Sequence, residues 1–218
     1  MKFVIAFAAV VAVAYAGVPA YGPKCVAPNG QGLPAALKEF VDLLPIEDLA
    51  NIYLTAVTSD EEVQKVLAYL ESKDFANFLI AISKEPDFDK LVNYACKELY
   101  LDFAYYYNVV AGILGLPPLN RPFDVIDPSE RRAGFIGMIE DMIDVIPVYK
   151  IKDLWEEKLE KDELFKKAIE FLKSNDFKNM VKFVEELPEF QKILVELRGM
   201  GVDIDTLIET IKRFLGWN

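Results

Sequence analysis

Paired acidic residues are the side chains of this sequence whose spacing most readily suggests catalysis. Adjacent carboxylates occur at Glu61-Glu62, Glu156-Glu157, Asp162-Glu163 and Glu185-Glu186. Two carboxylates can act as general acid and general base, as they do in glycosidases. These pairs, however, alternate with lysines at helical spacing, for example Glu156 with Glu160 and Lys158 with Lys161. We therefore interpret them as solvated helix faces rather than as a catalytic site.

The sequence contains no histidine, and this absence removes several other chemistries. Ser-His-Asp and Cys-His catalytic arrangements are excluded, and so is histidine-ligated zinc. The stretch from Asp124 to Asp127 lacks the oxygen density and the central glycine of a calcium loop. A glycine-rich loop that could cradle phosphate is also missing. We predict no catalytic residues, no metal site and no cofactor.

Two cysteines, Cys25 and Cys96, allow one disulfide bond. Cys25 lies in a stretch rich in glycine and proline, and Cys96 lies in a helical pattern. In a secreted protein, a bridge between them would tie the irregular start of the chain to the first helical region. The alternative is two free thiols, with Cys96 packed as a small hydrophobic side chain. The sequence leaves both alternatives open.

The chain repeats one helix boundary, and this repetition indicates how its helices are arranged. The segment YLESKDF, residues 69–75, recurs as FLKSNDF, residues 171–177. Ser72 and Ser174 are good N-caps, because a serine hydroxyl can accept a hydrogen bond from a free N–H of the first turn. The stripe Phe75, Phe78, Leu79 and Ile82 follows the first cap at the spacing of one helical face.

The repetition extends over both halves of the chain at one offset. Pro45 and Pro147, Asp60 and Asp162, and Pro86 and Pro188 are each 102 residues apart. The chain therefore contains an internal duplication. Each proline precedes acidic and then periodic apolar residues, as expected of a proline at the first helical position. Ser59 and Glu62 add the spacing of a capping box.

The pattern predicts an all-α protein made of two tandem repeats, each with five to six short amphipathic helices. In the first repeat we expect helices near 35–44, 46–57, 60–71, 73–84, 87–98 and 102–114, and we find no convincing strand. The expected organisation is a signal peptide at 1–16, an irregular segment at 17–33, repeat 1 at 34–118, a linker at 119–133 and repeat 2 at 134–218. Such short helices are stable only when their apolar faces are buried. The simplest closed arrangement is a pseudo-symmetric shell with all stripes turned inward, and its interior is either filled or hollow.

The first residues and the charge of the chain bear on where it works. Lys2, a short apolar run and Ala14-Tyr15-Ala16 are typical of a secretory signal cleaved after Ala16. The net charge is −11, and removing Lys2 makes it −12. A chain this acidic lacks the basic footprint that nucleic acids require. We expect a secreted protein that binds no nucleic acid, and its oligomeric state is open.

The order of these motifs resembles the insect allergen-related repeat family, which includes cockroach group 1 allergens and mosquito G12-type microvillar proteins. The resemblance rests on FVDLLP and MIDVIP, on the two YLESKDF-type segments, on the proline-acid-Phe segments at 86–88 and 188–190, and on ILG and FLG near the repeat ends. The first repeat departs from the family pattern, because residues 98–102 lack a counterpart of Gly201. We expect a tighter turn or a continued helix there.

The resemblance implies a protein secreted by midgut cells, whose shell encloses a large apolar cavity that holds fatty acids or similar lipids. It also implies two alternatives, a specifier-type protein that alters glucosinolate breakdown products and a structural protein of the gut lining. We expect a binding protein rather than an enzyme. The candidate lipid-binding residues, any of which can instead be ordinary core, are Phe75, Phe78, Leu79, Ile82, Phe88, Leu91, Val92, Phe177, Met180, Val181, Val184, Phe190, Ile193 and Leu194.

Overall fold

The computed structural model describes residues 24–30, 32–103, 105–106, 132–215 and 217, and its described part contains helices and no strands. The prediction of an all-α protein is confirmed. The expected signal peptide, most of the linker expected at 119–133 and most of the helix expected at 102–114 lie outside the described residues, although Phe103, Tyr105 and Tyr106 are helical.

Helix positions repeat along the chain. The first half contains α2 (Leu33–Val41), α3 (Ile46–Ser59), α4 (Glu61–Leu70), α5 (Lys73–Ser83) and α6 (Pro86–Leu99). The second half contains α8 (Gly134–Val145), α9 (Val148–Lys161), α10 (Glu163–Lys173), α11 (Asn175–Glu186), α12 (Pro188–Gly199) and α13 (Ile204–Leu215). Each of the helices α3 to α6 begins 102 residues before its counterpart among α9 to α12. The helix ends expected for the first half lie within three residues of those observed.

The repeated serine caps are present as predicted. The Ser72 hydroxyl accepts a hydrogen bond from the Phe75 amide at 3.3 Å, and the Ser174 hydroxyl accepts one from the Phe177 amide at 3.2 Å. Both serines have extended backbone conformations, which end the preceding segment and aim the side chain at the first turn of the next helix.

The capping box expected from Ser59 is wrong. Ser59 is the last residue of α3, and its hydroxyl donates to the Thr55 carbonyl at 2.6 Å. The N-cap of α4 is the next residue, Asp60, whose carboxylate accepts from the amides of Glu62 and Val63. The expected position of the prolines is also only half correct. Pro86 and Pro188 occupy the first turn of their helices, but Pro45 and Pro147 immediately precede α3 and α9.

The end of α6 follows one of the two expected alternatives, a continued helix. At the offset of 102, α6 extends to Leu99, two residues further than α12, which ends at Gly199, and Tyr100 then adopts a left-handed conformation with φ of 54°. Gly201, the residue that ends the corresponding turn after α12, has φ of 94°. The Leu101 amide then donates to the Ala95 carbonyl at 2.9 Å. The tyrosine therefore makes the turn for which the second repeat uses glycine, in a conformation that non-glycine residues rarely adopt.

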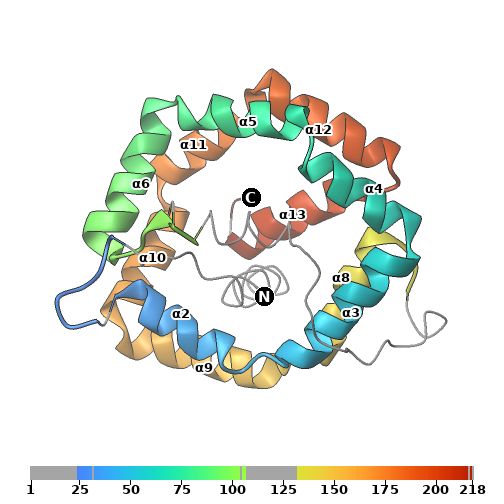
Figure 1. Ribbon diagram of the computed structural model, residues 1–218. Helices are drawn as coiled ribbons and strands as arrows, with labels where there is room; N and C mark the ends of the chain where they lie inside the picture. Colours follow the sequence, from blue (N-terminus) through green and yellow to red (C-terminus); the bar gives the residue numbers. More distant parts are fainter. Residues whose placement is uncertain (1–23, 31, 104, 107–131, 216, 218) are drawn as a thin grey trace.

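The helices form a ring in which each repeat packs against the other (Figure 1). In the ring, α3 packs on α8 and α5 packs on α12, and the counterpart pairs α9 with α2 and α11 with α6 are also in contact. This exchange of partners is what a pseudo-twofold axis between the repeats requires. Helix α13 lies within the outline of the ring in Figure 1 and contacts α12. It also contacts α11, because Lys212 pairs with Glu185 at 2.6 Å.

A hydrophobic core lies where α2, α9 and α10 meet. Phe40 and Phe165 are both buried, and their rings stack at a centroid distance of 5.5 Å. The Trp155 ring stands edge-on to Phe165 at 5.0 Å. Buried Leu49 and Ile151 belong to the same cluster. Residues from both repeats therefore share one core, and neither repeat is a separately packed unit in this region.

The first turn of α8 is capped by side chains of the other repeat. The Asp60 carboxylate accepts a hydrogen bond from the Gly134 amide at 2.7 Å, and the Glu62 carboxylate accepts one from the Phe135 amide at 3.0 Å. Gly134 has φ of 80°, and a Cβ there would lie 2.9 Å from both Glu62 carboxylate oxygens. Glycine is therefore needed for the close approach as well as for the conformation. We call this group of hydrogen bonds the inter-repeat cap.

The interpretation of the acidic pairs as solvated faces is therefore wrong for Glu62. It is also wrong for Lys158, whose side chain is only 14% exposed and pairs with Glu39 of α2 at 2.6 Å. The interpretation does hold for Glu156 and Glu157, whose side chains are exposed on α9. Tertiary pairing, which helical periodicity does not reveal, separates the two cases.

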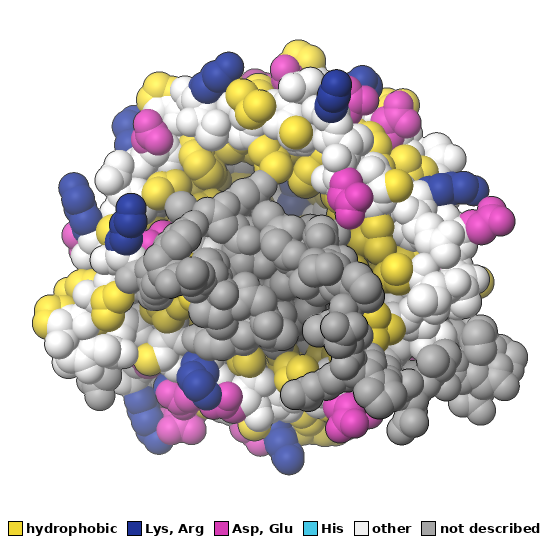
Figure 2. Space-filling model, in the orientation of Figure 1, with side chains coloured by type: hydrophobic (Ala, Val, Ile, Leu, Met, Phe, Trp, Pro, Cys, Tyr) yellow, Lys and Arg dark blue, Asp and Glu magenta, His cyan; other side chains and the backbone are white. Residues whose placement is uncertain are grey.

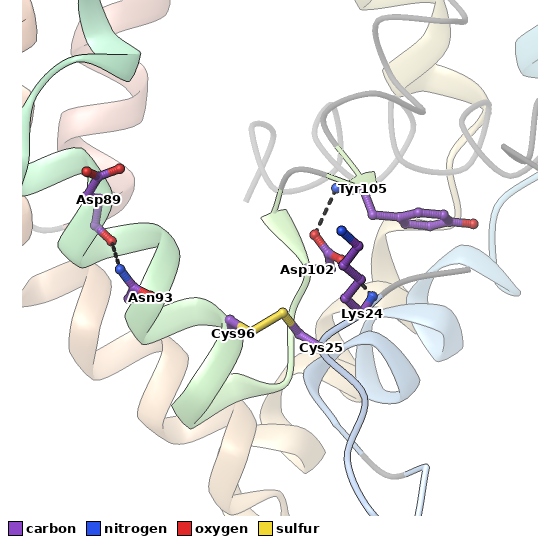
Figure 3. The surroundings of a disulfide bond; sticks show 7 residues. All are labelled: Lys24, Cys25, Asp89, Asn93, Cys96, Asp102 and Tyr105. Atoms are coloured by element: carbon purple, nitrogen blue, oxygen red, sulfur yellow. Dashed lines mark hydrogen bonds between the residues drawn. A yellow bond between two sulfur atoms is a disulfide. The ribbon is translucent and has the colours of Figure 1, made fainter. Parts of the chain in front are cut away.

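The two cysteines are joined (Figure 3). Cys25 and Cys96 form a disulfide with a Cα–Cα distance of 5.1 Å across a sequence separation of 71. Beside it, the Lys24 amide donates to the Asp102 carboxylate at 2.7 Å, and the same carboxylate accepts from the Tyr105 amide. The start of the described chain is thereby attached to the last turns of α6 and to the segment that follows.

Candidate functional site

The stripe residues of α5 and α12 meet in one apolar cluster. Buried Phe78 and Ile193 form its centre together with Tyr69 of α4, and Phe78 lies 5.7 Å from the Phe190 ring. The other predicted residues packed here are half-buried, and they are Phe75, Leu79, Ile82, Val184 and Phe190. The structure thus brings together seven of the fourteen candidates, and we call this group the α5–α12 cluster.

A second group of candidates lines a cleft of about 280 Å³, which we call the α6–α11 cleft. Leu91, Phe177 and Met180 are its predicted residues. The complete lining consists of Asp87, Lys90, Leu91, Tyr94, Phe171, Asp176, Phe177, Asn179 and Met180. The cleft therefore combines an apolar wall with charged groups from the first turns of α6 and α11.

The remaining four candidates lie elsewhere. Phe88 is half-buried, and its ring stands edge-on to Phe103 at 5.7 Å. Val92 and Val181 are half-buried. Leu194 is buried. None of these four belongs to the α5–α12 cluster as its described residues define it, or lines the α6–α11 cleft.

Most of the candidates keep part of their surface free of contact. Phe78, Ile193 and Leu194 are buried, whereas the other eleven are only half-buried. Figure 2 shows hydrophobic side chains gathered along the inner edge of the ring and charged side chains around its outer circumference. A closely packed interior would cover rings and branched chains of this size almost completely. The inner wall of the ring therefore presents apolar surface beyond what its own contacts cover.

Sequence reasoning missed three aromatic residues at these two sites. Tyr69 is buried in the α5–α12 cluster, and its hydroxyl has no hydrogen-bond partner among the described residues. In the cleft, the Tyr94 and Phe171 rings stack at 4.3 Å. Tyr69 and Phe171 occupy equivalent positions just before the two serine caps, so the duplicated segment itself contained the signal for them.

Burial and charge perturb the tyrosines of both sites. Burial raises the pKa of Tyr69, and the carboxylates of Asp74 and Glu196 raise it further. Burial also raises the pKa of Tyr94, whereas nearby Lys167 opposes the rise. Both hydroxyls therefore stay protonated at neutral pH and are able to donate hydrogen bonds.

The other notable depression lies on the surface between α2 and α9. It measures about 370 Å³ and is lined by Glu39, Leu43, Lys150, Asp153, Leu154 and Glu157. Four of its six lining residues are charged, so it resembles a solvated groove more than an apolar pocket. Within the described part of the chain, no three His, Cys, Asp or Glu side chains are grouped to hold a metal ion.

The sequence was compared with known proteins. Residues 32–208 match the family described as "Insect allergen related repeat, nitrile-specifier detoxification". The chain belongs to the insect allergen related repeat family. A relative in Anopheles gambiae, Protein G12, is 30% identical over 197 residues, covering 88% of this chain and 91% of the relative. The family match and the relative agree with the resemblance that the sequence motifs indicated, and both span the two halves of the ring.

Three apolar or partly apolar surfaces of this member of the insect allergen related repeat family are candidates for ligand binding. Among the described residues, no helix is both long enough and apolar enough to span a membrane. The α5–α12 cluster, the inner edge of the ring and the α6–α11 cleft are the surfaces on which a function can be built.

Proposed function

We propose that the protein is a secreted carrier that binds fatty acids or similar lipids inside the ring and works in the insect gut lumen. The observation that carries this proposal is the half-burial of eleven apolar side chains of α5, α6, α11 and α12, together with the hydrophobic inner edge in Figure 2. An acyl chain laid against that wall would cover the exposed apolar surface.

The energetics favour a flexible apolar chain as ligand. Each methylene group moved from water into an apolar environment contributes about 0.8 kcal/mol. The wall offers aliphatic and aromatic side chains and few fixed polar groups, so it selects for hydrophobic length rather than for one head group. The acidic exterior, with a net charge of −11 for the whole sequence, favours a protein that stays dispersed in a luminal fluid.

Two neighbouring residues of α5 allow a direct test with matched substitutions. Leu79 is half-buried in the α5–α12 cluster, whereas the next residue, Ile80, is 49% exposed. We expect wild-type protein to bind the fluorescent fatty acid cis-parinaric acid and to release it when oleate is added. Leu79→Asn weakens binding several-fold because it places an amide on the apolar wall, and Ile80→Asn leaves binding unchanged. Equal effects of the two substitutions would show that the inner wall is not the binding surface.

The description of the family names nitrile-specifier detoxification, and the corresponding activity is the alternative function. It is tested by incubating the purified protein with myrosinase and a glucosinolate and separating the products. We expect the ratio of nitrile to isothiocyanate to be the same with and without the protein. A dose-dependent rise in nitrile would replace the carrier proposal with a specifier function. Immunolocalisation in midgut tissue tests the proposed site of action.

A further inference from the structure

Because of the internal duplication, the molecule contains two equivalent junctions between a helix of repeat 1 and a helix of repeat 2, which we call seams. Shifting the α5–α12 pair by 102 residues gives the α11–α6 pair. Asp74 of α5 then corresponds to Asp176 of α11, and Lys192 of α12 corresponds to Lys90 of α6. Each seam therefore has one aspartate and one lysine at equivalent positions, and the two seams can be compared directly.

The α5–α12 seam is closed. Lys192 pairs with Asp74 across it at 2.8 Å. Behind the ion pair, the Phe78 and Phe190 rings are 5.7 Å apart, and Phe78 and Ile193 are buried. A bridging ion pair on the outside and a filled apolar contact beneath it seal this junction between the repeats.

The α6–α11 seam is open. Lys90 pairs with Asp87 of its own helix at 2.7 Å, and the described residues show no ion pair between Lys90 and Asp176. The two groups are nevertheless close, because both line the α6–α11 cleft. Met180, the counterpart of Phe78, is only half-buried here. The α6–α11 seam therefore lacks the ion pair that spans the α5–α12 seam, and its apolar contact is incomplete. The cleft of about 280 Å³ lies at this position.

A row of aromatic side chains begins at this opening. The stacked pair of Tyr94 and Phe171 is followed by Phe177, whose ring lies 5.6 Å from Phe171. Phe177 in turn lies 5.6 Å from Trp217. The Trp217 amide donates to the Lys212 carbonyl of α13, the helix within the outline of the ring in Figure 1. A row of aromatic rings in contact thus extends from the cleft to the C-terminal end of α13.

We propose that the α6–α11 seam is the portal through which lipid enters and leaves the ring, and that it closes when Lys90 exchanges Asp87 for Asp176. The closed form has its template in the same molecule, in the Lys192–Asp74 pair. This inference rests on the proposed function as a lipid carrier. Because exposed ion pairs are weak, the exchange requires little free energy and the portal opens readily.

A blocking substitution tests the portal. Asn179 lines the cleft and is exposed, and its counterpart at the closed seam, Asn77, is also exposed. Asn179→Trp places a large ring over the opening, and Asn77→Trp is the matched control at the equivalent exposed position of α5. In stopped-flow experiments with cis-parinaric acid, we expect Asn179→Trp to slow both association and release by about tenfold, which corresponds to about 1.4 kcal/mol of added barrier. The dissociation constant stays nearly constant, and Asn77→Trp behaves as wild type.

The switch is tested by removing its alternative partners. Asp87→Asn releases Lys90 toward Asp176 and should slow exchange of the probe, whereas Asp176→Asn should accelerate it. Glu189→Gln, at the counterpart of Asp87 beside the closed seam, should change neither rate. Rates that are unaltered in Asn179→Trp, with binding intact, overturn the portal and leave the carrier function standing. If wild-type protein takes up no cis-parinaric acid, the carrier function and the portal are both wrong.

Discussion

Removal of the disulfide should destabilise the fold far more than the loss of its local contacts would suggest. The bridge joins Cys25 to Cys96 across a sequence separation of 71. In the chain-entropy account, closing a loop of this size in the unfolded chain contributes about 4 kcal/mol. The native start of the chain keeps other attachments, such as the Lys24 hydrogen bond to Asp102 at 2.7 Å. The expected effect therefore comes mainly from the unfolded state.

The test compares wild-type protein with the double variant Cys25→Ser, Cys96→Ser by thermal unfolding. For a protein of about 200 residues, 1 kcal/mol corresponds to about 2–4 °C in Tm. We expect Tm to fall by about 10 °C, and a reducing agent should lower the wild-type Tm similarly while leaving the double variant unchanged. A fall of less than about 2 °C would refute the reasoning, because it would mean that the bridge does not constrain the unfolded chain.

Three further predictions concern the packing and charges of the ring. Asp60→Ala removes a cap of α4 and the partner of the α8 first turn, so it should cost about 2–3 kcal/mol of unfolding free energy, whereas Asp162→Ala removes one helix cap and should cost about 1 kcal/mol. Phe165→Ala should cost about 3–5 kcal/mol, because it empties the centre of the shared core. The hydrogen bond from Arg198, aided by its charge, holds the pKa of Asp205 below its ordinary value, so the stabilisation it gives is present above the unfolded-state pKa and is lost as pH falls through the lowered pKa. Arg198→Gln should raise that pKa in an NMR titration.

Urea unfolding measures the first two effects. Equal losses for the two aspartate variants would contradict the inter-repeat cap. Tyr149→Ala, at a residue that is 86% exposed, is the control for Phe165→Ala and should be nearly neutral. An Asp205 carboxyl that titrates identically with and without the Arg198 guanidinium would show that their bidentate pair, at 2.7 and 2.8 Å, does not persist in solution.

The elements that local chemistry determines could be predicted from the sequence. Ser72 and Ser174 sit between an apolar stripe that ends and another that begins, and the hydroxyl of each meets a free amide one turn later. Because the same helix boundaries occur twice, 102 residues apart, the helix positions predicted for the first half were close to those observed.

The features that depend on the other repeat could not be predicted. The second role of Asp60 is one of these, because the Gly134 amide that its carboxylate also binds is 74 residues away in the other repeat. Lys158 follows the same helical spacing as its exposed neighbours, but Glu39 of the first repeat covers it. Helical periodicity reports which face of a helix is apolar and not which helix covers it.

For the candidate site, too, the sequence predicted local features but not contacts between the repeats. The stripes identified the residues that face other helices, and the α5–α12 cluster brought seven of them together. Periodicity did not distinguish the closed seam from the open one, because Lys192 and Lys90 have the same local sequence relation to an acid at i−3. Only the positions of α11 and α12 in the ring show that one lysine bridges the seam and the other does not.

The measurement that tests the central claim most directly is organic extraction of the protein purified from secreting insect cells, followed by mass spectrometry of the extract. The account predicts at least one mole of fatty acid or similar lipid per mole of protein, and the same lipid should be lost from protein carrying Leu79→Asn more than from protein carrying Ile80→Asn. An extract without lipid, from folded protein that also fails to bind cis-parinaric acid, would contradict the claim that the ring is a lipid carrier.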